Sequence, residues 1–265
     1  MFLVIIMHIV IKPYHKFKAI AVNKTKTINL IVSLFLCIVI HATNKVYLIH
    51  GYGGLGIEME IIHKAIEKAG YVSEIYTYPS LVKDVDSVGR MLFDKIQKEN
   101  YDTVSFVTHS MGALVVRSLF ENLDSLTSFP FIYRIVMIAP PNNGSPVADY
   151  FSKFSYLKFI VGPNLNNLTT NSLTGASKYP IPTCEVGLIA CNFGKKKGLN
   201  IFIKDDNDGV LIPEQTKLGI EKDIVFVKSW HVGLLFDQKV IKNVTTFLQN
   251  GKFETKNIYC ETQIN

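Results

Sequence analysis

One serine of the chain stands where a run of strand-forming residues gives way to a helix-forming run. Residues 104–112 read VSFVTHSMG, and ALVVRSLFENL follows them. A serine on a sharp turn between a strand and a helix is held out toward a substrate, so that its weak hydroxyl can act as a nucleophile. The segment THSMG departs from the pattern G-x-S-x-G only at Thr108, and Gly112 supplies a small residue that the tight turn requires. The spacing therefore predicts Ser110 as a nucleophile.

A serine nucleophile needs a general base, and four histidines outside the first 42 residues are available for that role. His63 falls on the polar face of a predicted helix, where we expect a solvated side chain. His109 adjoins Ser110 in the chain and cannot fold back onto it. His50 ends the first predicted strand, a position suited to shaping a loop. His231, between the last predicted strand and the last predicted helix, is therefore the predicted base.

The base in turn needs a carboxylate that orients it, and three aspartates precede it in the segment DDNDGVLIP at 205–213. Asp208 comes directly before Gly209 and an apolar Val-Leu-Ile run, which places it at a turn. We predict Asp208 as the acid. Asp205 and Asp206 are expected to be solvated turn formers, although either of them remains an alternative.

An attacked carbonyl also develops a negative charge, which backbone N–H groups can stabilise. Met111 follows the nucleophile at the start of a predicted helix, where the helix dipole reinforces its N–H. The second donor is predicted in the glycine-rich loop HGYGG after the first strand, at the N–H of Tyr52. Such a loop is otherwise a weak signal for nucleotide binding, and the chain contains no GK[ST] segment.

The elements that must position these residues alternate along 45–249. Strands are predicted at 45–50, 72–78, 103–109, 134–140, 184–190, 201–203 and 223–227, and helices at 57–70, 84–98, 111–123 and 232–249. Near-continuous apolar strands separated by helices predict an α/β fold with a mostly parallel central sheet and helices on both faces. Without repeats or low-complexity linkers, 43–265 is expected to be one domain with its site at the carboxyl ends of the strands.

The positive charge of the chain is concentrated in its first 42 residues. The formal net charge is +6, but residues 1–42 contain five lysines and no acidic residue. Residues 43–265 therefore carry 23 basic and 22 acidic side chains. Because a nearly neutral remainder lacks a basic face for phosphates, the composition excludes nucleic acid as a partner.

The same 42 residues are predicted to be a signal peptide or a membrane anchor. The apolar run INLIVSLFLCIVI at 28–40 follows the lysines and precedes His41-Ala42-Thr43, the order of a secretory signal peptide. The run is shorter than the about 20 residues of a membrane span. A long region before it and bulky Ile40 near the expected cut leave an uncleaved anchor, or a wrongly assigned start, as alternatives. We expect an exported protein (periplasmic, secreted or in the secretory pathway) or one anchored by this segment.

Three cysteines follow the predicted leader. In an exported chain Cys184 and Cys191 can close a small loop and leave Cys260 free, or all three thiols can be unpaired. No CxxC or Cys/His spacing in the sequence suggests a metal site.

Five blocks of the sequence resemble successive blocks of lipase-like α/β-hydrolases. They are LIHGYGG, THSMGALVVR, APPNNGSPVAD, NDGVLIP and HVGLL, in that order, and the resemblance spans about residues 45–249. It implies an α/β-hydrolase fold in which Ser110, Asp208 and His231 take the triad roles, with the N–H groups of Tyr52 and Met111 as oxyanion donors. Thr108, which replaces a glycine, is the departure, and it puts the local packing of the turn in doubt.

The resemblance also implies a lid segment at 147–178, after the APPNNGSP block. Its first half, VADYFSKFSYLKFIVGPNLNNL, is rich in aromatic and apolar residues, which suits an acyl chain, although an ordinary core helix with irregular flanks has the same composition. The expected function is hydrolysis of carboxylic esters of lipids or small molecules, without a cofactor and with possible membrane association. The alternatives are an acyltransferase or thioesterase that uses the same triad, a hydrolase-fold binding protein without activity, and an apolar membrane-associated interaction module.

Overall fold

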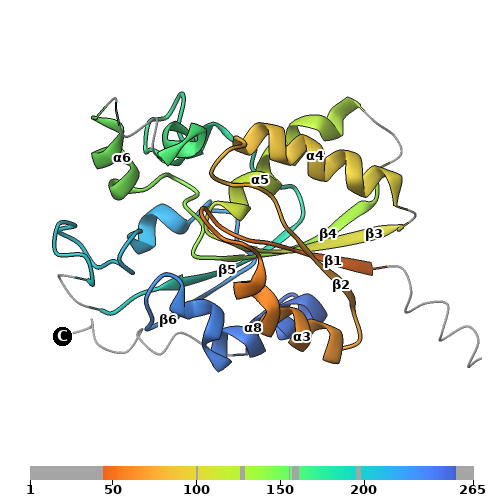
Figure 1. Ribbon diagram of the computed structural model, residues 1–265. Coiled ribbons are helices and arrows are strands. Elements are labelled where there is room, and N and C mark those ends of the chain that lie inside the picture. The colour runs from red at the N-terminus through yellow and green to blue at the C-terminus, as the bar shows by residue number, and fades with distance from the viewer. Residues whose placement is uncertain are drawn as a thin grey trace, which may run out of the picture. The chain divides into compact units, whose positions relative to one another are not determined.

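The computed structural model describes residues 44–99, 101–125, 129–154, 156, 161–194 and 198–254, which Figure 1 shows in colour. The predicted leader at 1–42, Cys260 and part of the predicted lid (155 and 157–160) lie outside these residues. No helix in the described part of the chain has both the length and the apolar character needed to span a membrane.

Six parallel strands form a sheet in the order β2-β1-β3-β4-β5-β6 (Figure 1). The strands are β1 (Asn44–Ile49), β2 (Val72–Tyr76), β3 (Thr103–His109), β4 (Phe131–Ile138), β5 (Glu185–Cys191) and β6 (Asp223–Val227). Successive side chains alternate between the faces, so that Tyr47 and Ile49 pack in one core and Val46 and Leu48 in the other. Both faces of the sheet are therefore buried, as near-continuous apolar strands predict.

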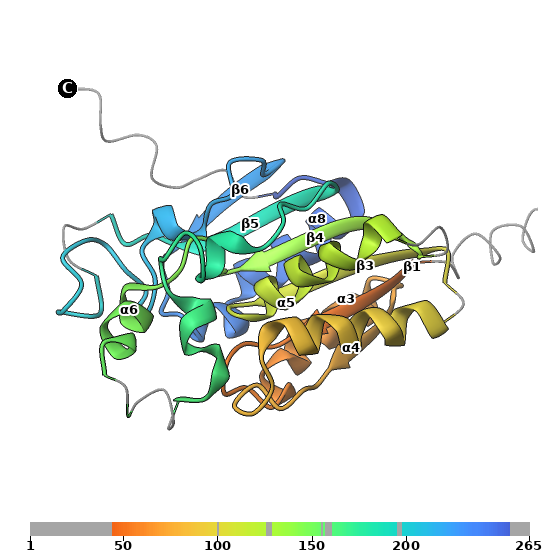
Figure 2. The ribbon, with the colours of Figure 1, turned by 90° about the horizontal axis from the view of Figure 1, so that it is seen from above.

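Helices cover both faces of the sheet (Figures 1 and 2). On one face lie α4 (Val85–Lys98) and α5 (Gly112–Leu119), and on the other lie α3 (Glu60–Lys68) and α8 (Gln238–Asn250). Short 3-10 helices complete the described elements: η1 (Ile57–Met59), η2 (Phe120–Ser125), η3 (Pro163–Leu168), η4 (Ala176–Lys178), η5 (Pro213–Thr216) and η6 (Gly233–Phe236). The predicted α/β class, with a parallel sheet between two helical layers, is confirmed.

One predicted strand, 201–203, is wrong. These residues form a turn, in which Ile201 and Phe202 are 79% and 90% exposed. The loop folds back because the Leu199 N–H donates to the Asn207 carbonyl (3.1 Å) and the Asn200 N–H to the Asn207 side chain (2.8 Å). Strand-forming side chains do not make a strand where no neighbouring strand accepts the backbone hydrogen bonds.

The possible disulfide between Cys184 and Cys191 is not formed, and both thiols are free. Cys184 directly precedes β5 and Cys191 ends it. Seven residue steps along a strand span about 23 Å, whereas a disulfide needs Cα atoms within about 7 Å. The extended strand therefore holds the two cysteines too far apart to pair.

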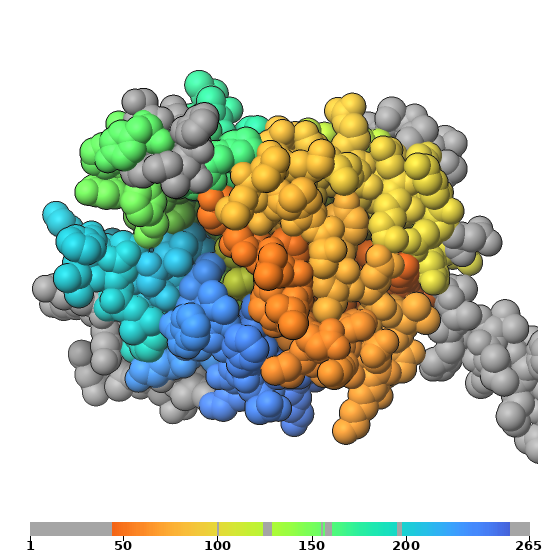
Figure 3. Space-filling view, viewed as in Figure 1, coloured from red at the N-terminus to blue at the C-terminus, as the bar shows by residue number. Residues whose placement is uncertain are grey.

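Between β4 and β5 the chain leaves the sheet, and this connection contains 147–178, the segment predicted as a lid and called the lid segment below. Its first helix, α6 (Pro146–Ser152), is capped by Ser145, whose Oγ accepts the Val147 N–H (3.2 Å) and donates to the Val210 carbonyl (2.8 Å). The helices η3 and η4 follow. In the space-filling view α6 and the loop at 198–206 lie at the same end of this fold, which is the end where the strands finish (Figures 1 and 3).

Candidate active site

Ser110 stands on a strained turn directly after β3. Its φ of 50° is in the left-handed region, and its N–H donates to the Ile138 carbonyl at the end of β4 (2.9 Å). Two glycines make room for this turn. A Cβ on Gly112 would lie 2.4 Å from the Ile49 carbonyl oxygen, and one on Gly51 would lie 2.9 Å from the Ser110 Cβ. The predicted turn is therefore present, and its small residues are required by close backbone contacts.

Thr108, the departure from the usual pattern, is accommodated within β3. Its side chain is fully buried, and the residue pairs with Ile49 of β1 and Met137 of β4 without a register shift. Its hydroxyl has no hydrogen-bond partner among the described residues. An unsatisfied buried hydroxyl costs about 1–3 kcal/mol, but it leaves the position of Ser110 unchanged.

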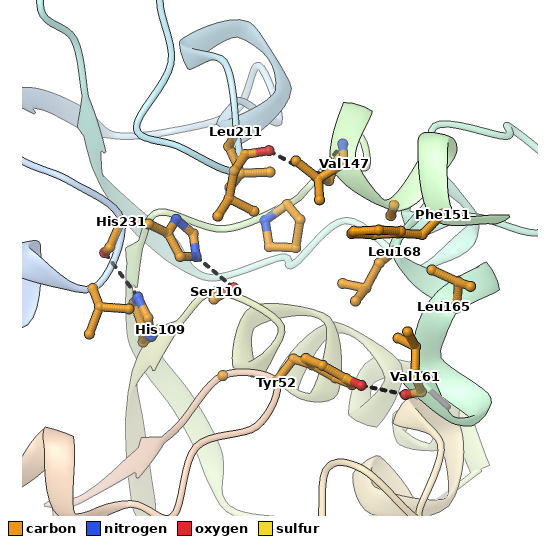
Figure 4. Close-up of a pocket in the computed structure, with 16 residues that line it drawn as sticks. Tyr52, His109, Ser110, Val147, Phe151, Val161, Leu165, Leu168, Leu211 and His231 are labelled. Atoms are coloured by element: carbon orange, nitrogen blue, oxygen red, sulfur yellow. Dashed lines mark hydrogen bonds between the residues drawn. The ribbon is translucent and has the colours of Figure 1, made fainter. Parts of the chain in front are cut away.

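The three residues predicted to act together do meet at the carboxyl ends of the strands. The Ser110 hydroxyl lies 2.9 Å from His231 Nε2, and His231 Nδ1 lies 2.7 Å from Asp208 Oδ2. Figure 4 shows the imidazole of His231 pointing at Ser110. With the ring proton on Nδ1, His231 donates to the carboxylate and its Nε2 is free to accept the serine proton.

Asp208 is held by its own turn. Its Oδ1 accepts the N–H groups of Val210 (2.9 Å) and Leu211 (2.8 Å), and the side chain is buried. Burial alone would raise the pKa of the Asp208 carboxyl, but these bonds and the contact with His231 outweigh it and lower the pKa. Asp205 is exposed, and Asp206 accepts the Gly194 N–H (2.7 Å) instead of meeting the histidine. Of the three aspartates, only Asp208 contacts His231.

His231 is positioned through its backbone as well. Its N–H donates to the Asp208 carbonyl (3.0 Å), and its carbonyl accepts a hydrogen bond from His109 Nε2 (3.2 Å; Figure 4). Burial lowers the pKa of His109 to about 3, so its ring is neutral and can donate from only one nitrogen. This role was not predicted from the sequence. The period of two along β3 was the available signal, because it puts His109 on the face of Val107, opposite α5.

The other two histidines have different surroundings. His50 is buried, stacks on Tyr78 with 4.2 Å between ring centroids, donates from Nδ1 to the Gly51 carbonyl (2.8 Å) and accepts the Tyr78 N–H (3.2 Å). It therefore supports the loop after β1, as its position predicted. His63 is not fully solvated as expected, because it is half-buried on α3 with Nε2 3.3 Å from the Ser73 carbonyl.

Two backbone N–H groups, those of Tyr52 and Met111, have no partner among the described residues. In the described part of the chain, neither the Tyr52 N–H nor the Met111 N–H donates to another protein group. Met111 follows the nucleophile and precedes α5, and Tyr52 lies in the loop after β1 that lines the same pocket. Met111 therefore adjoins the serine in the chain, Tyr52 lines the same pocket, and the N–H groups of both are available to a ligand.

Three of the other N–H groups of the loop GYGGLG at 51–56 are already engaged. The Gly53 N–H donates to Ser80 Oγ (2.9 Å), and the Gly54 N–H to the Gly51 carbonyl (3.2 Å). The Leu55 N–H donates to the Glu58 carboxylate (3.3 Å). A phosphate would need these donors and would meet the negative charge of Glu58. The loop is therefore not built as a nucleotide-binding turn, although its glycines fit that pattern.

A pocket of about 380 Å³ opens in front of Ser110. Apart from the serine and the two histidines, its walls are predominantly apolar (Figure 4). They are formed by Gly51, Tyr52, Pro141, Ser145, Val147, Ala148, Phe151, Val161, Leu165, Leu168, Val210, Leu211 and Val232. The volume falls within the range of small-molecule sites, and the apolar lining suits a hydrocarbon chain.

The segment predicted as a lid lines the pocket and is bonded to the loops around it. The Tyr52 hydroxyl donates to the Val161 carbonyl across the pocket (Figure 4), and burial raises the pKa of that hydroxyl. Asn164 on η3 is fully buried. Its amide donates to the carbonyls of Ser80 and Lys83 (2.8 Å each), and its oxygen accepts the Val85 N–H (2.9 Å).

Arg117 fixes the base of the lid segment to α5. Its buried guanidinium donates to the carbonyls of Asn142 (2.9 Å) and Pro180 (3.0 Å) and to that of Tyr179. Burial lowers the pKa of Arg117 to about 10, so it stays charged near neutral pH. No signal in the sequence pointed to this role, because an arginine on a predicted helix is usually solvated.

Metal or cofactor ligands do not gather elsewhere in the described residues. No group of three or more His, Cys, Asp or Glu side chains in that part of the chain is placed to hold a metal ion.

Comparisons with known structures agree on the fold. The lin2722 gene product of Listeria innocua superposes with a TM-score of 0.53 at 16% identity, over 81% of this chain and 96% of that one. A metagenomic carboxyl esterase gives 0.58 at 19% identity, over 73% and 66% of the two chains. An extracellular α/β-hydrolase from a Paenibacillus species gives 0.50 at 14% identity, over 77% and 97%. The chain therefore has an α/β-hydrolase fold.

At the level of sequence, no curated protein matches the chain. One family model does match, over residues 16–171, which is more than half of the chain. Its description is "Domain of unknown function (DUF7379)". The chain belongs to this family, the DUF7379 domains of unknown function.

Proposed function

We propose that this protein is a serine hydrolase that cleaves carboxylic esters. The observation that carries the proposal is the continuous relay from the Ser110 hydroxyl to His231 (2.9 Å) and from His231 to Asp208 (2.7 Å). A hydroxyl, a neutral imidazole and a buried carboxylate in this order are the groups that acyl transfer to serine requires.

The reaction begins when Ser110 Oγ attacks the acyl carbonyl and His231 Nε2 takes its proton. Asp208 stabilises the imidazolium that forms, and its lowered pKa keeps it ionised for this purpose. The alcohol leaves with the proton from His231 and an acyl-Ser110 ester remains. Water, deprotonated by His231, then releases the carboxylic acid and restores the serine.

The oxyanion of each tetrahedral intermediate is stabilised by the N–H groups of Tyr52 and Met111. Both N–H groups lack a protein partner in the described structure. Loss of one such donor typically costs about 100- to 1000-fold in kcat, so the loop after β1 contributes to the rate in addition to the triad.

The substrate class follows from the pocket. Its apolar walls extend from Ser110 to the lid segment, where Phe151, Leu165 and Leu168 lie (Figure 4). An aliphatic acyl chain fits such a lining. Each methylene that is buried contributes about 0.8 kcal/mol, or roughly a fourfold gain in kcat/KM, until the pocket is full. The esterase among the similar structures supports the same reaction type.

The cellular location is part of the proposal and rests on the sequence alone. The lysines and the apolar run of residues 1–42 are proposed to export the chain or to anchor it to a membrane. Fractionation of cells that express the full chain and a form without this segment tests that part separately.

Hydrolysis of a chain-length series of p-nitrophenyl esters tests the enzymatic proposal. Ser110→Ala is expected to lower kcat by about 10⁶-fold, as loss of a triad serine does, and to abolish labelling by a fluorophosphonate. Ser172→Ala, which changes an exposed serine of the lid segment, is the matched control and should keep both properties. Labelling with turnover only in the presence of an added alcohol acceptor would indicate an acyltransferase. Neither labelling nor turnover in the wild type would contradict the proposal.

A further inference from the structure

The acid of the relay lies in a stretch of the chain without regular secondary structure. β5 ends at Cys191 and η5 begins at Pro213, and the described residues between them form no helix or strand. This connection extends beyond the end of β5 (Figure 1). A catalytic group on a loop is placed less precisely than one on a strand or a helix, so the position of Asp208 depends on the bonds within its loop.

Asn207, the residue directly before the acid, uses every hydrogen bond that an amide side chain can make. The residue is buried, with 1% of its surface exposed. Its Oδ1 accepts the N–H groups of Asn200 (2.8 Å) and Gly209 (3.0 Å). Its Nδ2 donates to the carbonyls of Asn200 (3.2 Å) and Asp205 (2.9 Å). Two donated and two accepted bonds are the full capacity of this side chain, so all of it is spent on the loop.

The bond to Gly209 holds the peptide unit that directly follows the acid. The carbonyl of this unit belongs to Asp208 and accepts the His231 N–H (3.0 Å), whereas its N–H belongs to Gly209 and donates to Asn207 Oδ1. Because a peptide unit is planar, the two bonds together fix its orientation. The Asn207 side chain therefore holds the unit that carries the acid and bonds to the backbone of the base.

The other bonds of this turn hold the acid from both sides. Asn200 Nδ2 donates to the Gly209 carbonyl (3.1 Å), and the Leu199 N–H donates to the Asn207 carbonyl (3.1 Å). The Asp208 N–H donates to the carbonyl of Leu211 (3.1 Å). The backbone on either side of the acid is thus bonded within the protein, so the direction of its carboxylate is set before a substrate binds.

We propose that Asn207 is a positioning residue, which holds the carboxylate of Asp208 against His231. It does not line the pocket, and it acts through the peptide unit between Asp208 and Gly209. Its importance to the rate rests on the proposed function. A residue that only stabilised the loop would make the same hydrogen bonds, so the test needs measurements that loop stability does not change.

Asn207→Leu keeps the approximate volume of the side chain and removes all four bonds. In the full chain, kcat for p-nitrophenyl esters is expected to fall about 100-fold with little change in KM, as when a catalytic group is misplaced by about 1 Å. Asn192→Leu is the matched control. Asn192 Oδ1 accepts the Gly194 N–H (2.7 Å), again two residues ahead in the same connection, but in the described structure it has no hydrogen bond to the turn at 207–211. This variant should keep the wild-type kcat.

A double-mutant cycle tests whether Asn207 acts through the acid. In the background of Asp208→Asn, the change Asn207→Leu should lower kcat by less than about threefold, because the contact that Asn207 positions is already lost. A residue that only stabilised the fold would lower kcat by the same factor in both backgrounds. Asn207→Ser, whose hydroxyl can still accept the Gly209 N–H, should restore kcat about tenfold relative to Asn207→Leu.

A measurement without turnover separates this inference from the proposed function. The proton between His231 Nδ1 and Asp208 Oδ2 (2.7 Å) should give a far-downfield signal in the ¹H NMR spectrum of the wild type, which Asp208→Asn abolishes. Asn207→Leu should shift or remove this signal, and Asn192→Leu should keep it. The same result in a wild type that hydrolyses no ester would retain the role of Asn207 and reject the proposed chemistry.

Three results would overturn the inference. The first is a wild-type kcat together with a wild-type NMR signal in Asn207→Leu. The second is an equal loss of kcat in the variants at Asn207 and Asn192, and the third is an equal factor in both backgrounds of the cycle. If circular dichroism shows that Asn207→Leu does not fold, Asn207→Ser takes its place. It loses the bonds of Nδ2 and should lower kcat about tenfold, and an unchanged kcat would then overturn the inference.

Discussion

The two walls of the pocket are built in different ways. On one wall, Ser110, His231 and Asp208 each have side-chain and backbone hydrogen bonds to fixed partners at the ends of the strands. The opposite wall, formed by α6 and η3, presents apolar side chains to the pocket. It is connected across the pocket by the bond from Tyr52 to Val161.

This difference separates the two tasks of the site. Each catalytic side chain is held by several hydrogen bonds, because a shift of about 1 Å in a reacting group lowers the rate strongly. The apolar wall needs only the right volume and surface, because the hydrophobic effect has no direction. Changes on the first wall should therefore affect every substrate alike, whereas changes on the second should depend on the acyl chain.

The largest expected effect comes from Asp208→Asn on the first wall. The amide keeps the shape of the side chain but favours the wrong tautomer of His231, so kcat is expected to fall by about 10⁴-fold for short and long esters alike. Initial rates with a series of p-nitrophenyl esters measure it. Asp205→Asn, on the exposed aspartate of the same loop, is the control and should retain activity. A loss confined to long chains would contradict the division between the walls.

The next effect is a pH dependence that originates in His109. Its pKa is about 3 in the folded protein against an ordinary 6.5, so the unfolded chain binds a proton that the folded one does not. The free energy of unfolding therefore decreases as the pH falls below about 6.5, and it goes on decreasing until about pH 3. Between about pH 7 and about pH 4.5, the free energy of unfolding measured with urea should decrease by about 2 kcal/mol less for His109→Gln than for the wild type. Parallel curves for the two proteins would show that His109 is not a buried neutral base.

The smallest effect is expected from Tyr52→Phe, which removes only the hydroxyl that reaches the lid segment. The backbone N–H stays in place, so kcat/KM for short esters should change little. The hydrogen bond of the hydroxyl contributes about 1 kcal/mol, and its loss removes a link between the loop after β1 and the lid segment. The ratio of long-chain to short-chain kcat/KM should therefore change by up to about fivefold. Tyr150→Phe removes an exposed hydroxyl from the same lid as a control. An equal decrease of kcat/KM for all chain lengths would instead assign the Tyr52 hydroxyl to the first wall.

Local patterns in the sequence were enough to predict the class of fold and the first wall. Strands and helices with clear periods, such as β3 and α5, form where local preference and burial agree. Parallel strands bring their carboxyl ends to one edge, so the residues that follow them had to come near one another. For this reason Ser110, Asp208 and His231 could be chosen from motif, order and elimination.

Tertiary structure alone decided which neighbours these residues have. The contact of His109 with the His231 carbonyl joins residues 122 positions apart, and the hydroxyl of Tyr52 meets a carbonyl 109 positions away. The apolar triplet at 201–203 resembles a strand locally, yet it stays exposed because no strand edge receives it. A local sequence pattern indicates which secondary structure a segment prefers. Long-range contacts depend on the packing of the whole chain, because a small shift of one element changes the neighbours of many side chains.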